Sequence, residues 1–444
     1  MTDGPSSRIA IRGSEWRTIG ILLAIYALAY LDRQILTLLV DPIREDLGVS
    51  DVEIGFLQGL GFTLFYALCG PFLGWMVDRY RRRQIVFGGI LVWSLCTAAS
   101  GFADTYHELL IARFGVGAGE AALLPAAYSI ISDQVERSRL SRAMAVFSLG
   151  AIVGGSLSYV IGGALVTVAQ QYEGFAFPVL GMLRDWQMVF LAIGLIGMPM
   201  AFLIFAIPEP GRRTERGSAA ALAQSDDSHF RRHWRFYACH ILGFSLFCFL
   251  GAATTAWSAT YVLRVHDWSV GGIGALLGMK NLIGGTLGML GGGILADWLA
   301  KRGHRDAHLR MYVFILPVFA GAGILAFTAG NMWLVFAGLT VISIIAPFIA
   351  VAAAGLQLAT PPDRRGLVSA VFLLVYNIIG FGFGPAVVAL ISRWMAQDGG
   401  NIGLALALSY AVVTPLAIAL LALGMKPMRA AVLEVSNRQD AAAA

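Results

Sequence analysis

Charged side chains are scarce in this sequence of 444 residues. Asp, Glu, Lys and Arg together make up 13% of it, about half of the share that a soluble domain carries. Hydrophobic residues make up 57%, and the mean hydropathy is +0.72. Because the apolar residues are spread along the whole length, the composition excludes a soluble globular fold and predicts that lipid is the solvent.

Cysteine and histidine are also rare. The four cysteines lie in apolar segments without paired spacing, which argues against a disulfide framework or a metal cluster. Of the seven histidines, all but His240 fall in loops or at the ends of apolar runs, and none is expected to have metal-ligand spacing with a carboxylate. We therefore predict no metal and no cofactor. An integral-membrane lipid-modifying enzyme, or a receptor, is a remote alternative, because an enzyme needs a nucleophile, metal or acid/base cluster at one membrane depth.

Long apolar runs divided by turns and charges fill the chain. Spanning about 30 Å of hydrocarbon takes about 20 helical residues, and the sequence offers twelve such runs. The polar first sixteen residues and the length of the run that follows indicate a first membrane helix rather than a cleavable signal. The predicted spans are residues 18–40, 53–77, 84–102, 107–131, 142–168, 187–207, 236–263, 270–296, 309–329, 332–359, 366–392 and 402–425.

Lys and Arg gather on one side of these spans. That side holds the loops RYRRRQ (79–84), ERSRLSR (136–142), KRGHRDAHLR (301–310) and DRR (363–365), together with both ends of the chain. The opposite side holds only Arg44, Arg184, Arg264 and Arg393. Positive loops favour the cytoplasm, so we predict that both termini are cytoplasmic. This placement explains the net charge of +5 without a nucleic-acid partner.

The sequence repeats itself once across a polar linker. Gly74-Trp-Met-Val-Asp78 ends the second predicted helix, and Gly293-Ile-Leu-Ala-Asp297 ends the eighth. Two similar six-helix bundles are typical of carriers whose site lies between them. The predicted domains are an N-terminal six-helix bundle (1–207), a cytoplasmic linker (208–235), a C-terminal six-helix bundle (236–425) and a cytoplasmic tail (426–444). The fold class is thus all-α integral membrane, with two pseudo-symmetric bundles.

Several of these motifs resemble those of the major facilitator superfamily. GWMVDRYRRRQ (74–84) resembles its signature after helix 2, RFGVGAGE (113–120) its helix-4 signature, and PEP (208–210) the usual exit from helix 6. More narrowly, residues 26–150 are similar to the spinster subfamily. The resemblance implies the major facilitator fold and transport of lysophospholipids or sphingosine-1-phosphate. The segment SLGAIVGGSLSYVIGG (148–163) lacks the proline of the helix-5 antiporter signature, so the direction of coupling stays open.

Five charged residues lie away from the ends of the predicted spans, where each costs about 2.5–3.5 kcal/mol unless it is paired, hydrated or neutral. They are Asp32, Arg33, Arg113, Glu120 and Lys280. Neighbours on a helix point about 100° apart, so Asp32 and Arg33 should each pair with another helix, with Arg113 and Glu120 as the candidates. We predict that Asp32 couples transport to protons, with Glu120 as the second candidate. Arg33, Arg113 and Lys280 would hold an anionic head group. The alternative is a buried network that only fixes helix packing.

The repeated motif predicts a different device. Asp78, Arg79 and Arg82, with Asp297 in the second copy, would form a cytoplasmic latch between the bundles, next to Gly74 and Gly293. The alternative is that RYRRRQ only sets topology. Arg81 takes the place of the glycine that is usual in this signature, and Trp298 that of a basic residue in the second copy.

Other polar residues and glycines are weaker candidates. Gly117, on the stripe between Arg113 and Glu120, should let another helix approach closely. The glycine run at 284–293 lies inside a span with no preceding strand, which favours helix packing over nucleotide binding. Residues that could line a cavity, or serve only as contacts between helices, are Tyr30, Tyr128, Tyr159, Trp257, Gln357 and Asn377.

Together these features predict a proton-coupled secondary transporter that works by alternating access. The expected cargo is an amphiphilic anionic or zwitterionic lipid, and a small organic anion such as a sugar acid is the alternative. The expected partners are the lipid bilayer, this substrate and protons, with the chain acting as a monomer. The short loops favour the bacterial cytoplasmic membrane.

Overall fold

The computed structural model describes residues 5–136, 139–172, 176–177, 181–209, 228–266, 268–361, 364–395 and 401–443. It contains twelve helical segments that are long and apolar enough to cross a membrane, which confirms the number predicted from the sequence. These segments are Glu15–Leu38, Asp51–Arg79, Arg82–Ser100, Tyr106–Gln134, Arg142–Gln171, Asp185–Ala206, His229–His266, Val270–Lys301, Ala307–Thr328, Met332–Leu358, Arg365–Met395 and Ile402–Arg438.

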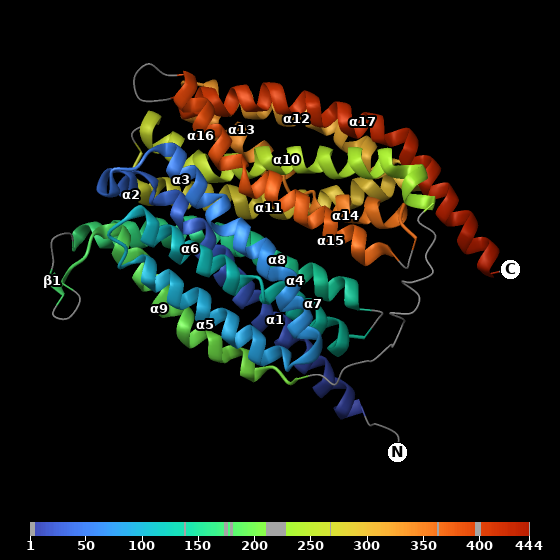
Figure 1. Ribbon diagram of the computed structural model, residues 1–444, viewed down its shortest axis with the longest axis horizontal. Coiled ribbons are helices and arrows are strands. Elements are labelled where there is room, and N and C mark those ends of the chain that lie inside the picture. Colours follow the sequence, from blue (N-terminus) through green and yellow to red (C-terminus); the bar gives the residue numbers. More distant parts are fainter. Residues whose placement is uncertain are drawn as a thin grey trace. The chain divides into compact units, whose positions relative to one another are not determined.

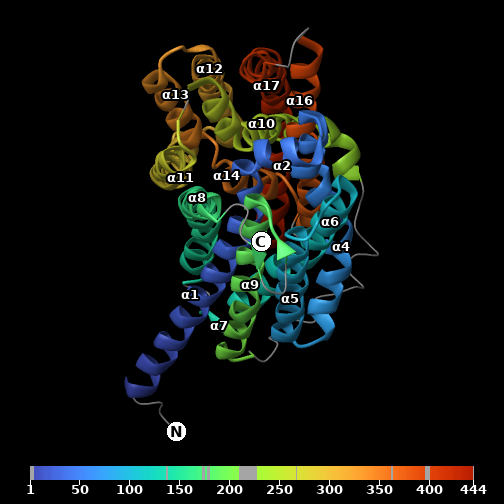
Figure 2. The same ribbon diagram turned by 90° about the vertical axis from the view of Figure 1, so that its left-hand side faces the viewer.

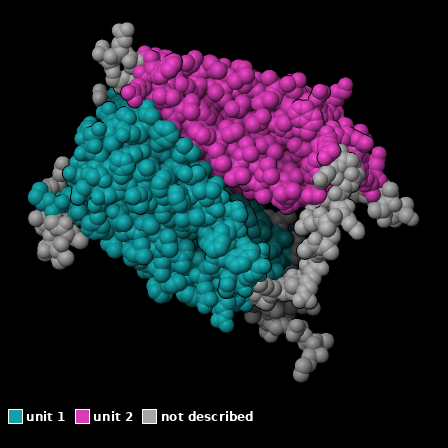
Figure 3. All heavy atoms as spheres, viewed as in Figure 1, with its two compact units in different colours: residues 1–214, 262–282 teal, residues 215–261, 283–444 magenta. Residues whose placement is uncertain are grey.

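The chain forms two compact units (Figure 3). Unit 1 consists of residues 1–214 and 262–282, and unit 2 of residues 215–261 and 283–444. Two long helices, α10 (Ser228–His266) and α11 (Val270–Lys301), contribute residues to both units.

Unit 1 is a helical bundle in which α1 packs along α8, and α5 lies beside both α6 and α9 (Figures 1 and 2). Its apolar interior includes the fully buried rings of Trp93 and Phe147. The two short strands pair antiparallel, with Ala176 opposite Met182. The elements are α1 (Pro5–Ile35), η1 (Leu36–Leu38), α2 (Val40–Leu47), α3 (Asp51–Gln58), α4 (Leu60–Arg79), α5 (Arg82–Ser100), α6 (Tyr106–Glu120), α7 (Leu123–Gln134), α8 (Leu140–Gln171), β1 (Ala176–Phe177), β2 (Gly181–Met182), α9 (Asp185–Ala201) and η2 (Phe202–Ala206).

Two helix starts of unit 1 follow from local sequence. Ser50 precedes α3 and Thr105 precedes α6, and each is followed three residues later by a glutamate. In both places the hydroxyl accepts from the glutamate's N–H and the carboxylate accepts from the cap's N–H, which forms a capping box. These boxes end the polar loops and fix where the next apolar helix begins.

Close helix approach in unit 1 depends on glycine. A Cβ atom added at Gly117 of α6 would overlap the carbonyl oxygen of Phe62 in α4, and one added at Gly154 of α8 would overlap that of Ala27 in α1. Only a residue without a side chain lets the backbones approach this closely. The predicted role of Gly117 as a contact point is confirmed.

Unit 2 is built around α12, which lies beside α13 and α17 (Figures 1 and 2). The glycine run of α11 includes Gly284, where an added Cβ would lie 2.8 Å from the Cβ of Ser343, and Gly288, where it would overlap Ile344. This close contact with α13 confirms the packing interpretation of that run. Besides α10 and α11, the elements are α12 (Ala307–Thr328), α13 (Met332–Ile345), α14 (Ile349–Leu358), α15 (Arg365–Tyr376), the π-helix η5 (Asn377–Gly382), α16 (Gly384–Met395) and α17 (Ile402–Ala443).

The ends of unit 2 differ from the sequence-based boundaries. Helix α10 begins at Ser228, inside the segment predicted as linker, and α17 continues to Ala443, past the predicted end at residue 425. Residues 210–227 of the predicted linker lie outside the described residues. The first turns of α10 and the last turns of α17 are joined by contacts of His229 and His233 with Glu434. Hydropathy detects apolar segments and therefore does not predict helical turns that are stabilised by such polar contacts.

Candidate functional site

A buried carboxylate joins three helices of unit 1. Asp32, near the end of α1, is 1% exposed. Its Oδ1 accepts from Arg113 Nη1 of α6 at 3.4 Å, and its Oδ2 accepts from the hydroxyl of Thr97 in α5. Arg113 is equally buried. The predicted pairing of Asp32 with Arg113 is therefore present, and the contribution of Thr97 was missed because nothing in its local sequence distinguishes it.

Arg33 makes a separate ion pair. Its Nη2 lies 2.6 Å from Oε2 of Glu120, at the end of α6. The guanidinium also lies over aromatic faces, 4.0 Å from the ring centroid of Phe62, 5.0 Å from that of Tyr30 and 5.3 Å from that of Tyr66. Guanidinium groups stack well on such faces. The adjacent charges of α1 thus have different partners on α6, as the angle between neighbouring helical side chains requires.

The four charges do not use all of their hydrogen-bonding capacity within the described part of the chain. Arg33 Nε, Arg113 Nε and Glu120 Oε1 are buried and have no protein partner there. A buried polar atom without a partner costs about 1–3 kcal/mol. Since native proteins rarely tolerate this cost, such atoms favour a site that takes water, a proton or a polar ligand.

The other predicted binding residues are more scattered. Tyr30 is part of the Arg33 cluster, and Tyr128 of α7 lies edge-on to Phe147, with 44% of its surface exposed. Lys280 is buried on α11, next to Asn281, whose amide donates to Ser156 of α8 at 3.1 Å.

Two further candidates belong to unit 2, and both have hydrogen bonds of their own. Asn377 begins the π-helix η5, and its amide donates to the carbonyl of Leu373 at 2.7 Å, so it is engaged with its own helix. The indole of Trp257 donates to Pro385. π-Helical turns are frequent at functional sites. The segment Asn377–Gly382 as a whole is therefore a better candidate for a functional role than the Asn377 side chain alone.

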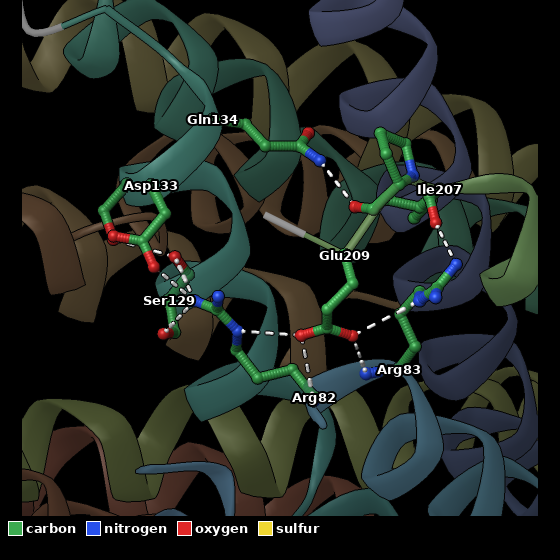
Figure 4. A network of polar contacts seen from close by, with 9 residues as sticks. Arg82, Arg83, Ser129, Asp133, Gln134, Ile207 and Glu209 are labelled. Carbon is green, nitrogen blue, oxygen red and sulfur yellow. Dashed lines mark hydrogen bonds and ion pairs between the residues drawn. The ribbon is translucent and has the colours of Figure 1, made fainter. Parts of the chain in front are cut away.

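The basic motif after α4 forms the network of Figure 4. Arg82 is 1% exposed, and its Nη1 contacts Asp133 Oδ2 at 2.5 Å and Ser129 Oγ at 2.9 Å. Its Nε contacts Glu209 Oε1 at 3.3 Å, while Arg83 Nε contacts Glu209 Oε2 at 3.2 Å. All of these partners belong to unit 1. These contacts therefore hold α5, α7 and the exit from η2 together within that unit.

Glu209 also acts as the N-terminal cap of α5. The N–H groups of Arg82 and Arg83 donate to its two oxygens at 3.2 and 3.1 Å, which satisfies two of the unpaired donors at that helix end. Burial opposes ionisation, but the hydrogen bonds from Arg83 and Arg82 outweigh it and hold the pKa of the Glu209 carboxyl below its usual value. Sequence reasoning identified the PEP motif but not this capping role, which joins residues far apart in the chain.

The rest of the predicted latch lies in exposed helix ends. Asp78 and Asp297 are exposed in the last turns of α4 and α11. Arg79 lies 4.2 Å from the Trp75 ring centroid, and Arg302 lies 3.7 Å from that of Trp298, so both copies carry an arginine on a tryptophan four residues before it. Gly74 and Gly293 have open space where a Cβ would be.

The segment between α11 and α12 in unit 2 contains a buried acid, Asp306, at the start of α12. It is 1% exposed, and its Oδ2 lies 3.2 Å from Arg310 Nη2 and 2.8 Å from Arg429 Nη2. Burial raises the pKa of the Asp306 carboxyl, but Arg310 and Arg429 outweigh burial and lower it below its usual value. Sequence reasoning treated these basic residues as topology signals and so missed the buried acid among them.

A second arginine cluster closes the other end of unit 1. Arg264, in the last turn of α10, contacts Asp41 of α2 at 2.6 Å and binds Asp51 of α3 through two bonds of 2.8 Å. Arg44 adds a weaker contact to Asp41 at 3.7 Å. Arg264 is 223 residues from Asp41 and 213 residues from Asp51 along the chain, so the sequence gave no indication that these side chains meet.

One group of described residues could hold a metal ion: His229, His233 and Glu434 of unit 2, whose ligand atoms all lie within 4.8 Å of one another. The prediction that no histidine has metal-ligand spacing overlooked the four-residue interval between His229 and His233. That interval places both rings on one face of α10.

The sequence matches a family model described as Major Facilitator Superfamily over residues 22–385. Among curated proteins, it is 28% identical over 397 residues to an MFS-type efflux pump of Mycolicibacterium smegmatis, covering 88% of each chain. It is 26% identical over 405 residues to protein spinster of Drosophila melanogaster, covering 88% of this chain and 64% of that one. It is 28% identical over 326 residues to the probable L-galactonate transporter of Escherichia coli, covering 69% of this chain and 67% of that one.

The fold has a solved counterpart. A bacterial homologue of the human lysosomal transporter Spinster, crystallised in an inward-facing and unoccupied conformation, superposes with a TM-score of 0.76. The match covers 96% of this chain and 98% of that one, at 22% identity. At this identity the likeness establishes the fold, and it confirms the predicted all-α architecture.

Proposed function

The chain belongs to the Major Facilitator Superfamily as a transporter of spinster type, and from this premise we propose that it is a proton-coupled secondary transporter working by alternating access. The proposed cargo is an amphiphilic lipid with an anionic or zwitterionic head group, such as a lysophospholipid or sphingosine phosphate. The observation that carries the proposal is the buried Asp32–Arg113 pair beside the Arg33–Glu120 pair.

Asp32 is the proposed proton-binding group. While it is ionised, Arg113 is neutralised and the four charges sum to zero. A proton on Asp32 would leave Arg113 without its counter-ion, and that buried cation would then favour an anionic ligand. Proton binding and anion binding are coupled in this way, since each changes the charge that the other meets.

Arg33 is the proposed head-group contact. Its guanidinium can bind phosphate or carboxylate through two parallel hydrogen bonds. Phe62, Tyr30 and Tyr66 surround it with aromatic surface. A charged group next to an apolar wall suits an amphiphile, whose head would meet the arginine while its chain contacts the rings.

A small organic anion is the second candidate. The similarity to the probable L-galactonate transporter of E. coli favours it, and a sugar acid needs the same arginine contacts for its carboxylate. The two cargoes differ in the apolar surface that they require, so the aromatic rings around Arg33 favour the lipid.

The proposed setting is the bacterial cytoplasmic membrane, with both termini in the cytoplasm and the chain acting as a monomer. The support is the concentration of Lys and Arg in one set of loops, including RYRRRQ and KRGHRDAHLR.

The test is proton movement in proteoliposomes that contain a pH-sensitive dye. Wild type, Asp32→Asn and the exposed control Asp104→Asn would each be given lysophospholipids, sphingosine-1-phosphate and sugar acids. Asp104 is a 79% exposed acid of the same unit. We expect a lipid-triggered signal in wild type and in the control that is lost in Asp32→Asn.

Other outcomes would revise the proposal. A signal from sugar acids alone would keep the mechanism and replace the cargo. Labelled-lipid flux with equal pH dependence in wild type and Asp32→Asn would contradict proton coupling through Asp32.

A further inference from the structure

Two histidines and a glutamate meet in unit 2, away from the charged site of α1 and α6. His229 and His233 lie one turn apart at the start of α10, and Glu434 lies near the end of α17. His229 Nδ1 is 3.2 Å from Glu434 Oε1, and His233 Nε2 is 2.9 Å from Glu434 Oε2. The imidazole side chains are 0% and 6% exposed. Three potential ligands therefore converge from two helices that are far apart in sequence.

The hydrogen bonds of His229 determine what its Nδ1 atom can do. Its Nε2 lies 3.1 Å from the carbonyl oxygen of Ala359, which can only accept, so Nε2 must carry the hydrogen. In the neutral ring Nδ1 then presents a lone pair to a carboxylate oxygen, and two acceptors repel each other. The contact is favourable only if a cation lies between them, either a second proton or a metal ion.

The arrangement fits a metal in several respects. Tetrahedral zinc with ligands at 2.0–2.1 Å needs ligand atoms about 3.3 Å apart. His229 Nδ1 lies 3.2 Å from Glu434 Oε1 and His233 Nε2 lies 2.9 Å from Oε2, and the ligand atoms of the three side chains all lie within 4.8 Å of one another. One carboxylate oxygen and both nitrogens would have to approach the shorter spacing when zinc binds. A ligating histidine usually donates its other N–H to a carbonyl or carboxylate, as His229 does to Ala359. Tyr237 also bonds to that carbonyl, at 3.1 Å, and fixes it in place.

Helix α10 bends at His233, which has φ −108° and ψ 16° and lies between two helical segments. The His233 ring contacts Glu434, and its centroid lies 4.7 Å from that of His229.

Two arginines compete for the same carboxylate. Arg438 Nη2 lies 2.8 Å from Glu434 Oε1, and Arg232 Nη1 lies 3.4 Å from Oε2. Their side chains are 47% and 68% exposed, so both can move into water when a dication binds, whereas the histidines cannot. Because Arg438 and a metal ion would compete for Glu434, removing Arg438 should strengthen metal binding.

We propose that His229, His233 and Glu434 form a binding site for a divalent transition metal, with zinc as the metal that suits this donor set best. Two imidazoles and one carboxylate supply three ligands, and water completes the coordination. The metal would tie the first turns of α10 to the last turns of α17 and, through Ala359, to the end of α14. The site makes no use of the charged pairs of unit 1 and does not depend on the proposed function.

The test is zinc binding by purified full-length protein whose affinity tag has been cleaved and whose metal has been removed with a chelator. Zinc would be titrated in competition with a chromophoric chelator, and cobalt(II) would report tetrahedral geometry through its visible absorption. We expect one zinc per chain. Loss of a residue that only supports a ligand weakens metal binding about 10- to 100-fold. His233→Ala and Glu434→Gln remove ligands themselves, so each should weaken zinc binding by at least that factor.

Three further variants separate a metal site from a structural ion pair. The control His107→Ala removes an exposed histidine at the start of α6 and should leave zinc affinity unchanged. Arg438→Gln should raise the affinity and should increase the rise in melting temperature that zinc produces. Absence of stoichiometric zinc binding in wild type would overturn the proposal and assign the cluster to a proton-linked ion pair. Equal affinity in wild type and the His229→Ala/His233→Ala double variant would overturn it too.

Discussion

The buried pair of Asp32 and Arg113 can be tested by removing its charges one at a time and then together. Both residues are 1% exposed, so removing one leaves the other as an unpaired buried charge. Such a loss costs about 3–5 kcal/mol. For a chain of this length we expect about 1–2 °C per kcal/mol, so Asp32→Asn and Arg113→Gln should each lower the melting temperature by several degrees. The amide oxygen introduced by Asp32→Asn can still accept from Thr97, which places that variant near the lower end.

The double variant should behave differently in stability and in transport. With both charges gone no unpaired charge remains, so the melting temperature should recover above that of either single variant. Transport driven by a pH gradient should remain absent, because the proton-binding carboxyl is missing. A purely structural pair would instead give a double variant that regains both properties.

The assay can use the chain's own thiols. The four cysteines are unpaired and none is exposed, so a thiol-reactive dye reports unfolding in detergent. The 79% exposed acid Asp104 serves as the control, and Asp104→Asn should melt as wild type does. Recovery of pH-driven transport in the Asp32→Asn/Arg113→Gln variant would refute the assignment of Asp32 as the coupling group.

Three further predictions concern the rest of the molecule. Glu209→Ala should lower the melting temperature through loss of the α5 cap, worth about 1 kcal/mol. Because the folded pKa of Glu209 is lowered, its contribution to stability is present above the usual carboxyl pKa of about 4.3 and is lost as the pH falls through the folded pKa. The melting temperatures of wild type and Glu209→Ala should therefore converge between pH 6 and pH 3. Arg264→Gln should destabilise the cluster with the carboxylates of α2 and α3, and Arg264→Lys should restore only part of the loss, because lysine cannot bind two oxygens as a fork; equal melting of both variants would contradict this. Gly117→Leu should abolish the monodisperse peak in size-exclusion chromatography, because its side chain would overlap the backbone at Phe62, whereas Gly70→Ala, with open space around it, should not.

Hydropathy and spacing predicted the part of this structure that depends on local sequence. The twelve spans follow from the lipid requirement for about 20 apolar residues each. The seven-residue interval between Arg113 and Glu120 placed both on one face of α6, facing the charges of α1. In these cases a single helix carries the information, so a single sequence is enough to extract it.

Several contacts that sequence reasoning missed join distant segments at loops or helix ends. Glu209 caps α5 although 127 residues separate it from Arg82, and Arg264 reaches the acids of α2 and α3. Glu434 meets His229 across nearly the whole second half of the sequence. Apart from the predicted latch, the sequence analysis interprets charges outside the spans by their sign alone, as signals of topology. The partners of these charges depend on how the helices pack. A single sequence does not show which residues of neighbouring helices lie next to each other.

The two ion pairs of α1 also explain why adjacent opposite charges are tolerated in an apolar helix. Arg113 and Glu120 are about 10 Å apart along α6 at 1.5 Å per residue, so consecutive residues of α1 reach partners two turns apart. The long side chain of Arg33 covers this distance and rests on aromatic rings on the way. The short side chain of Asp32 pairs instead with Arg113 and Thr97. A proton on Asp32 therefore changes the charge balance of Arg113 directly and leaves the Arg33–Glu120 contact in place. This separation would allow Asp32 to respond to protons through Arg113 while Arg33 keeps its contact with Glu120.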